Sequence, residues 1–331
     1  NGFAGVDFNS PGLSSDSLQL ALEAMLATGV TTCLPTIITE SEIYLRKCLS
    51  ALEKAKNSSS LAKTMVAGYH LEGPFLSKLP GYCGCHPVEE MVAADPEMFL
   101  RLQDSAGGNI RMVTLAPEIK GAITFIEKLV EKGIIVAIGH TAADNQTIQQ
   151  AIIAGAKLST HLGNATSAEL HKNYNPIMAQ LGEDRLSASF IADGYHLSQE
   201  VLKIYLRAKC PERVILITDA TAAAAAPPGL YRLGKSELQR ETEPVILNPQ
   251  TFRPVGSAVT LDQCVRNVMH WYALPLNEAV IWAAANPLKL LNSTKEQTKL
   301  PAPEQTVWWK EKEEEGWQVK AAKSGKFFFE V

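Results

Sequence analysis

The sequence predicts an α/β fold in which parallel strands curl into a barrel and helices cover the outside. Short apolar runs alternate regularly with longer helical patterns, which is typical of a parallel sheet. A polar residue able to do chemistry follows nearly every strand-like run, as expected where strand ends converge on one mouth. With 331 residues, 46% of them hydrophobic, the chain has enough material for one barrel of roughly 250 residues.

The predicted elements alternate in order. Buried strands are expected at Val30–Ile38, Thr64–Leu71, Ile110–Leu115, Ile134–Ile138, Lys157–Thr160, Ser187–Ala192 and Arg213–Thr218, which are short and apolar or small. Helices are expected between them at Asp16–Ala27, Glu40–Lys56, Val88–Leu102, Ala122–Lys132, Asn145–Ala154 and Ser198–Ala208.

A closed barrel has eight strands, one more than this count. We therefore expect that the first strand would stand before Asn1 and is missing from this chain. An open doubly wound sheet is the competing structure, and it explains less well why the strands end in chemically capable residues.

The pattern changes after the seventh predicted strand. Thr221–Ala226 is rich in alanine and leads into Pro227-Pro228-Gly229, which predicts a loop over the barrel mouth. Helices are expected at Leu261–Met269 and Asn277–Ala285. From Thr306 on, alternating and aromatic residues predict antiparallel strands, with Lys310–Glu315 as a solvated turn. We expect a barrel domain over residues 1–292 and the C-terminal strands of a small β-sandwich over residues 293–331.

Composition excludes several classes of function. The net charge of −4 argues against a nucleic-acid surface, and no apolar run approaches the ~20 residues that span a membrane. No signal peptide is visible, and six cysteines in so long a chain do not form a disulfide scaffold, so we expect a cytoplasmic protein. Cys83-Gly84-Cys85-His86 suggests either a metal clip or a loop with incidental thiols. The lack of a second cysteine pair favours the loop.

Five polar residues stand directly after predicted strands. They are Glu72, His140, His161, His196 and Asp219. Each alone is weak evidence, because a single buried histidine is usually a hydrogen-bonded structural residue. Together they indicate a shared cation, since burying several such groups without partners is costly.

One carboxylate and two imidazoles leave a coordination position open for water, which suits a catalytic Zn²⁺, although Fe²⁺ or another divalent ion also fits. Such an ion lowers the pKa of water towards ~7 and polarises a carbonyl. Asp219 is placed to move the water proton to a leaving amine, and His196 to donate a hydrogen bond to the carbonyl oxygen. These roles describe hydrolysis of an amide.

At these residues the chain resembles the N-acetylglucosamine-6-phosphate deacetylase family of the amidohydrolase superfamily. The resemblance covers Asn1 to about Leu291. It rests on matching stretches in the same order: Asn1-Gly2-Phe3-Ala4-Gly5-Val6-Asp7-Phe8-Asn9, His70-Leu71-Glu72-Gly73-Pro74-Phe75, Gly139-His140-Thr141, Thr160-His161-Leu162 with Asn164-Ala165, Asp193-Gly194-Tyr195-His196, Thr218-Asp219-Ala220, Tyr231-Arg232-Leu233-Gly234 and Gly256-Ser257-Ala258-Val259-Thr260.

The resemblance implies a TIM barrel of the amidohydrolase type with a small β-sandwich, and an enzyme that hydrolyses a linear amide bond. It implies one divalent metal held by Glu72, His140 and His161, with Asp219 as acid/base and His196 as a catalytic and substrate contact. It places the substrate, an amino-sugar phosphate, against His86, Asn164, Ala165, His171, Lys172 and Leu261. It also implies a homodimer in which a basic residue of the neighbouring subunit reaches the phosphate.

The chain departs from the family pattern at several positions. Lys172 stands where family members usually carry arginine, so phosphate recognition is expected to be weaker or more relaxed. Leu261 and Thr166 each replace a usual methionine. Residues that the family has before Asn1 include strand 1, which in some members holds a second metal. Two further hypotheses follow: deacylation of another N-acyl amino sugar or amino acid, and a fragment that binds metal or ligand without turnover.

Overall fold

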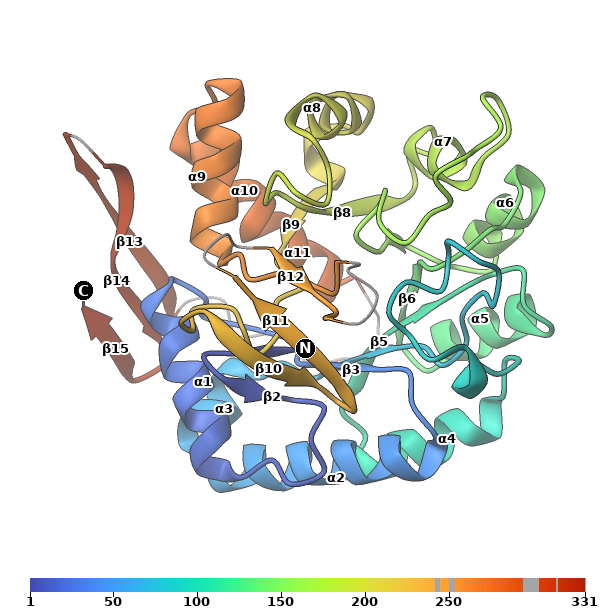
Figure 1. Ribbon diagram of the computed structural model, residues 1–331, viewed down its shortest axis with the longest axis horizontal. Coiled ribbons are helices and arrows are strands. Elements are labelled where there is room, and N and C mark those ends of the chain that lie inside the picture. The colour runs from blue at the N-terminus through green and yellow to red at the C-terminus, as the bar shows by residue number, and fades with distance from the viewer. Residues whose placement is uncertain (242–244, 250–253, 294–303, 314, 331) are drawn as a thin grey trace.

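The computed structural model describes residues 1–241, 245–249, 254–293, 304–313 and 315–330. At its centre is a curled parallel sheet whose strands follow one another in chain order, with helices around the outside (Figure 1). Its strands are β3 (Thr36–Ile38), β4 (Tyr69–Glu72), β5 (Ile110–Leu115), β6 (Ile135–Ile138), β7 (Leu158–Ser159), β8 (Ser187–Ile191) and β9 (Val214–Ile217).

The strand order confirms the predicted barrel-type sheet. A doubly wound sheet reverses its order at a switch point, whereas here every strand pairs with the next one in the sequence. The described residues hold seven parallel strands and no eighth. Strand side chains such as Leu71 and Val113 pack outward against helical residues such as Phe125, in one large hydrophobic core.

Helices surround the sheet, and several of them begin at a residue whose side chain caps the first turn. They are α1 (Ser15–Ala27), α2 (Glu42–Ser58), α3 (Ser60–Met65), α4 (Pro96–Ser105), α5 (Ala122–Glu131), α6 (Asn145–Ile153), α7 (Pro176–Leu181), α8 (Gln199–Ala208), α9 (Leu261–Tyr272), α10 (Leu276–Ala283) and α11 (Ala285–Leu291), with short 3₁₀ turns η1 (Val88–Glu90) and η2 (Pro211–Arg213). Ser14, Asp95 and Asp144 each accept a hydrogen bond from a first-turn backbone N–H.

Several predicted elements were partly wrong. The strand expected at Val30–Ile38 begins only at Thr36. The strand expected at Thr64–Leu71 begins only at Tyr69, because Ser59 caps α3 and keeps Thr64 and Met65 helical. The helix expected over Val88–Leu102 is interrupted after η1, and α4 starts afresh at Pro96 with Asp95 as its cap. Proline at the first helical position marks a helix start, so the signal was present in the sequence.

A small antiparallel sheet that the sequence did not predict follows the seventh parallel strand. It consists of β10 (Gly229–Leu233), β11 (Ser236–Arg240) and β12 (Ile246–Leu247). Leu233 and Leu238 pack with Ile38, at the end of β3, and with the buried alanine Ala223. The alanine-rich segment is therefore part of the packed structure that supports this sheet.

The chain start holds the alanine-rich segment in place. A short hairpin of β1 (Gly2–Phe3) and β2 (Val6–Asp7) lies beside it, and the backbone N–H of Ala4 donates to the carbonyl of Ala224 at 2.8 Å. A Cβ on Gly2 would lie 2.6 Å from the backbone nitrogen of Ala222, so only glycine permits this close approach.

The predicted C-terminal strands form an antiparallel sheet of β13 (Gln305–Lys312), β14 (Gly316–Ser324) and β15 (Phe327–Glu330) beside α1 (Figure 1). Strand β13 extends through Lys312, so the expected turn at Lys310–Glu315 is shorter than predicted. The boundary expected between residues 292 and 293 lies beside residues 294–303, outside the described part, and stays a prediction.

No helix among the described residues has both the length and the apolarity needed to span a membrane.

Lys209, at the end of α8, is buried and joins α7 to β8. Its Nζ donates to the carbonyl oxygens of Gln180 at 2.7 Å, Glu183 at 2.6 Å and Leu186 at 3.1 Å. Burial lowers the pKa of this ammonium to about 8. Because a single side chain satisfies three carbonyls, it fixes the connection between these elements.

Replacing Lys209 by Met should destabilise the fold by about 3 kcal/mol or more, because three carbonyls lose a charged donor. Denaturant unfolding measures this loss. The exposed Lys54→Met variant is the control and should change stability by no more than about 0.5 kcal/mol. Equal stabilities of the two variants would contradict the structural role of Lys209.

Candidate active site

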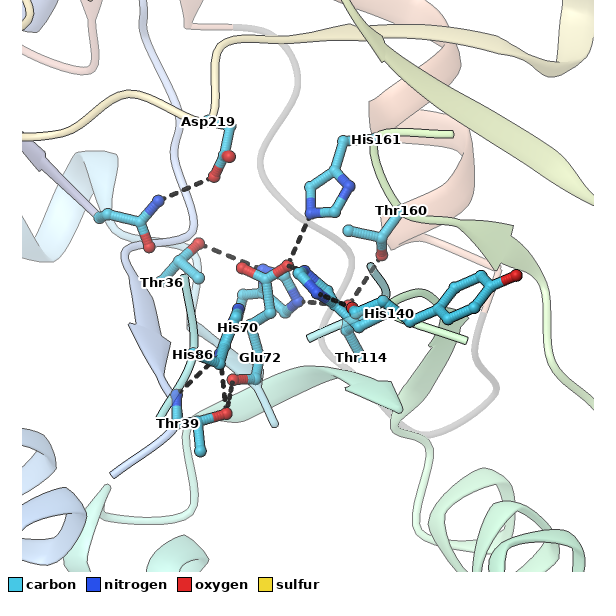
Figure 2. Close-up of polar contacts among 12 residues, drawn as sticks. Thr36, Thr39, His70, Glu72, His86, Thr114, His140, Thr160, His161 and Asp219 are labelled. Carbon is cyan, nitrogen blue, oxygen red and sulfur yellow. Dashed lines mark hydrogen bonds and ion pairs between the residues drawn. The ribbon is translucent and has the colours of Figure 1, made fainter. Parts of the chain in front are cut away.

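Glu72, His140 and His161 meet at the carboxyl ends of β4, β6 and β7 (Figure 2). Glu72 Oε1 lies 2.8 Å from Nε2 of His161 and 3.3 Å from Nε2 of His140. Their potential ligand atoms all lie within 4.8 Å of one another, and all three side chains are buried. The structure therefore brings together the three residues that the sequence singled out as metal ligands.

The electrostatics of this group favour a positive charge at its centre. Burial alone would raise the pKa of Glu72, but its close contacts with the His140 and His161 rings hold it well below its usual value. Burial would lower the pKa of His161, yet its hydrogen bond to Glu72 raises it to about 9. A proton on His161 thus compensates the buried carboxylate when no cation is present, and a metal ion would replace that proton.

The orientation of His140 supports the same interpretation. Its Nδ1 lies 3.0 Å from the carbonyl oxygen of Tyr82, which can only accept, so Nδ1 carries the proton. In the neutral ring Nε2 then carries the lone pair that faces Glu72 and the shared centre. Two imidazole nitrogens and one carboxylate oxygen at this spacing fit a divalent cation such as Zn²⁺ or Fe²⁺.

The backbone at the strand ends is strained at the same residues. His140 has φ 50°, His161 φ 29° and Asp219 φ 50°, all in the left-handed region that non-glycine residues rarely adopt. Such conformations persist only where the surrounding structure enforces them, and they cluster at functional sites. These turns aim the three side chains toward one region.

Asp219 follows β9 and faces the group from the side (Figure 2). Its Oδ1 accepts a hydrogen bond from Nδ2 of Asn1 at 2.8 Å, and its backbone carbonyl accepts one from the N–H of Ser257 at 2.9 Å. Burial, followed by the negative charge of Glu72, raises the pKa of Asp219. A carboxyl group with a raised pKa beside a cation site suits proton transfer.

Two more predicted histidines occupy defined positions. The His86 ring packs edge-on against His140 with centroids 4.4 Å apart, and its Nδ1 pairs with the Thr39 hydroxyl at 2.7 Å. Burial lowers the pKa of His86 to about 3, so this ring is neutral. His196 follows β8, and its Nδ1 lies 2.6 Å from Oδ2 of Asp193.

The remaining predicted substrate residues are more dispersed. Nδ2 of Asn164 is buried without a hydrogen-bond partner among the described residues, as expected of a donor kept for a ligand. Ala165, at φ 46°, lies against Gly84 of the loop that covers His140. His171 and Lys172 lie on an exposed loop before α7, where His171 stacks on Tyr174. Leu261 begins α9 and packs in the second core.

Sequence reasoning missed residues that hold the ligands in place. Glu118 accepts hydrogen bonds from the Thr141 hydroxyl at 2.5 Å and from the Ala142 N–H at 2.7 Å, directly after His140. It stands three residues after β5. No polar residue had been singled out after that predicted strand, as none had been after the first predicted strand. A carboxylate in that position was a usable signal.

A partly buried group of polar side chains lies next to the ligands and was also missed (Figure 2). His70, two residues before Glu72, pairs through Nε2 with the Thr114 hydroxyl at 2.7 Å and through Nδ1 with the Thr36 hydroxyl at 3.1 Å. Thr114 in turn pairs with Thr160 at 2.8 Å. Burial lowers the pKa of His70 to about 4, so a neutral ring crosslinks neighbouring strands under the site.

A curled parallel sheet with one glutamate, two histidines and a later aspartate at its carboxyl ends defines a metal-dependent hydrolase. The family model described as "Amidohydrolase family" matches residues 6–242. The chain belongs to the amidohydrolase family.

Its relatives within that family are N-acetylglucosamine-6-phosphate deacetylases. The Caenorhabditis elegans protein of that name is 31% identical over 312 residues, covering 91% of this chain and 73% of the relative. The Bacillus subtilis one is 34% identical over 257 residues, covering 77% of this chain and 64% of the relative. The solved structure of the Mycobacterium smegmatis deacetylase superposes with a TM-score of 0.87 at 31% identity, covering 99% of this chain and 84% of that one.

Replacing Glu118 by Gln should weaken metal binding by about 10- to 100-fold, because an amide cannot accept from both Thr141 and Ala142 in the same way. Competition with a chelator of known affinity measures the change. Glu127→Gln, on the exposed face of α5, is the matched control and should bind metal like the unchanged protein. Unaltered affinity in Glu118→Gln would show that this carboxylate does not orient His140.

Proposed function

We propose that this chain hydrolyses N-acetyl-D-glucosamine 6-phosphate to D-glucosamine 6-phosphate and acetate, in amino-sugar catabolism. The observation that carries the proposal is the buried Glu72–His140–His161 group with Asp219 beside it. The named relatives support the choice of substrate, since a mutant of the M. smegmatis enzyme was solved in complex with N-acetyl-D-glucosamine-6-phosphate. That structure superposes with a TM-score of 0.84 at 31% identity.

In this proposal Glu72, His140 and His161 hold one divalent ion, with Zn²⁺ as the first candidate and Fe²⁺ as the alternative. When bound, the ion acidifies water and polarises the acyl carbonyl. The neutral His86 ring beside His140, the free amide of Asn164, and Ala165 line the substrate side of the site. Leu261 contributes an apolar contact.

Asp219 moves the proton. As a water oxygen adds to the acyl carbon, Asp219 accepts the proton that the water loses. As the C–N bond breaks, it delivers that proton to the departing nitrogen, and acetate and the free amine leave. Its raised pKa suits both directions of this transfer.

The phosphate is bound at the rim. His171 and Lys172 are exposed, which suits the predicted homodimer in which such a basic pair reaches the neighbouring subunit's substrate. Lysine offers a point charge where arginine offers a fixed fork, so a relaxed preference for the phosphate is the second candidate specificity. The cytoplasmic location stays a prediction from the sequence.

The purified chain supplied with Zn²⁺ should release acetate from N-acetylglucosamine 6-phosphate, and a chelator should abolish the release. Asp219→Asn should lower turnover by roughly 10²- to 10⁴-fold because the proton carrier is lost, while the metal content stays unchanged. Enzymatic acetate detection and elemental analysis give the two readouts.

The exposed Asp184→Asn variant serves as control and should retain full turnover. Full activity in Asp219→Asn would refute the assigned role. Bound metal without any turnover in the unchanged protein would favour a different acyl substrate or a fragment that binds without catalysis.

Phosphorylated substrate should be preferred over N-acetylglucosamine, and Lys172→Ala should raise KM for the phosphorylated substrate about tenfold, as expected for loss of one charged hydrogen bond. Lys172→Arg should lower it. Steady-state kinetics on both substrates measures the effect, with the exposed Lys63→Ala as control. Equal rates on both substrates would reject phosphate recognition and favour deacylation of another N-acyl amino sugar or amino acid.

A further inference from the structure

The loop that carries His196 is held firmly from outside the site. The carbonyl of Ala192 accepts a hydrogen bond from Nδ2 of Asn267, on α9, at 2.7 Å. Gly194 has φ 81°, and a Cβ there would lie 3.4 Å from the Trp271 ring, on the same helix. The turn that precedes His196 therefore lies against α9 and is hydrogen-bonded to it at Ala192.

Asp193 lies inside this turn, and its carboxylate uses both oxygens. Oδ1 accepts from the backbone N–H groups of Tyr195 and His196, each at 2.9 Å. Oδ2 lies 2.6 Å from Nδ1 of His196, and the Asp193 side chain is 1% exposed. Burial would raise its pKa, but the contacts with His196 and the turn amides lower it, so the carboxyl is ionised.

An ionised carboxylate only accepts hydrogen bonds, so the proton in the 2.6 Å contact belongs to Nδ1 of His196. The two backbone N–H groups can only donate and both bind Oδ1. Oδ2 is therefore the oxygen that faces the ring. The neutral imidazole therefore carries its lone pair on Nε2. This excludes the tautomer that would let a neutral His196 donate from Nε2.

We propose that Asp193 is a positioning residue that locks His196 in the Nδ1–H tautomer, so that the neutral ring presents Nε2 to substrate as an acceptor. Donation from Nε2, as to an acyl oxygen, is then open only to a ring protonated on both nitrogens. The inference extends the proposed deacetylation, but the tautomer itself is a property of the substrate-free protein.

Asp193→Asn separates this role from a purely structural one. The amide oxygen is required by the two turn N–H groups, so the amide NH₂ must face Nδ1 of His196. Nδ1 of His196 must then accept a hydrogen bond from this NH₂, and the ring proton moves to Nε2. The turn is kept while the tautomer inverts.

Side-chain nitrogen NMR of the ¹⁵N-labelled, substrate-free protein distinguishes protonated from unprotonated ring nitrogens, and loss of one signal set in His196→Gln identifies this ring. The unchanged protein should show Nδ1–H and Asp193→Asn should show Nε2–H. An Nε2–H tautomer in the unchanged protein, or the same tautomer in both, would overturn the proposal. The measurement on the unchanged protein decides even if the variant does not fold.

Asp95→Asn is the matched control. Oδ1 of Asp95 accepts from the N–H groups of Glu97 and Met98 in the same turn geometry, and no histidine contact is among its recorded partners. Acetate release by Asp193→Asn should fall about 10- to 100-fold, whereas Asp95→Asn should leave it unchanged. Absence of acetate release from every protein would refute the proposed function, and the tautomer result would still stand by itself.

Discussion

The structure of the site depends on one buried carboxylate oxygen that two imidazoles share. Oε1 of Glu72 lies between His140 and His161 at the end of a sheet that excludes water, where an uncompensated charge would be costly. Left-handed turns bring the histidines inward, and the carbonyl of Tyr82 and the carboxylate of Glu118 fix the segment around His140.

Much of this was predictable because parallel strands carry information in a simple form. Their period and length predict the alternation of strands and helices. The residues that follow the strands are the candidate ligands, so the sequence alone predicted that Glu72, His140 and His161 would lie together with Asp219 nearby. The pattern does not encode the turns themselves. The sequence Gly139-His140-Thr141 does not predict that the backbone of His140 adopts the left-handed conformation. Glu118 and Asp193 were missed because their role lies in the neighbours that they orient, which only the folded chain reveals.

The errors in the predicted fold have similar causes. Hydrophobic spacing alone extended the helix over Val88–Leu102 across a proline that begins a new helix at Pro96. It also missed β10 to β12, whose short strands alternate weakly and gain their burial from Ile38 and Ala223, distant in sequence. Local sequence patterns thus predicted the alternating strands and helices well. The extra sheet of β10 to β12 depends on packing against residues distant in sequence, which local patterns do not contain.

The contact between Asn1 and Asp219 joins residues 218 positions apart, whereas Glu72 and His161 are separated by 89. Closing a chain loop costs about 0.6 kcal/mol more for each doubling of its length, and distant pairings form slowly. The three candidate metal ligands therefore meet across shorter chain loops than the contact between Asn1 and Asp219 spans. The chain start therefore reaches Asp219 only across a loop more than twice as long as the one that joins Glu72 to His161.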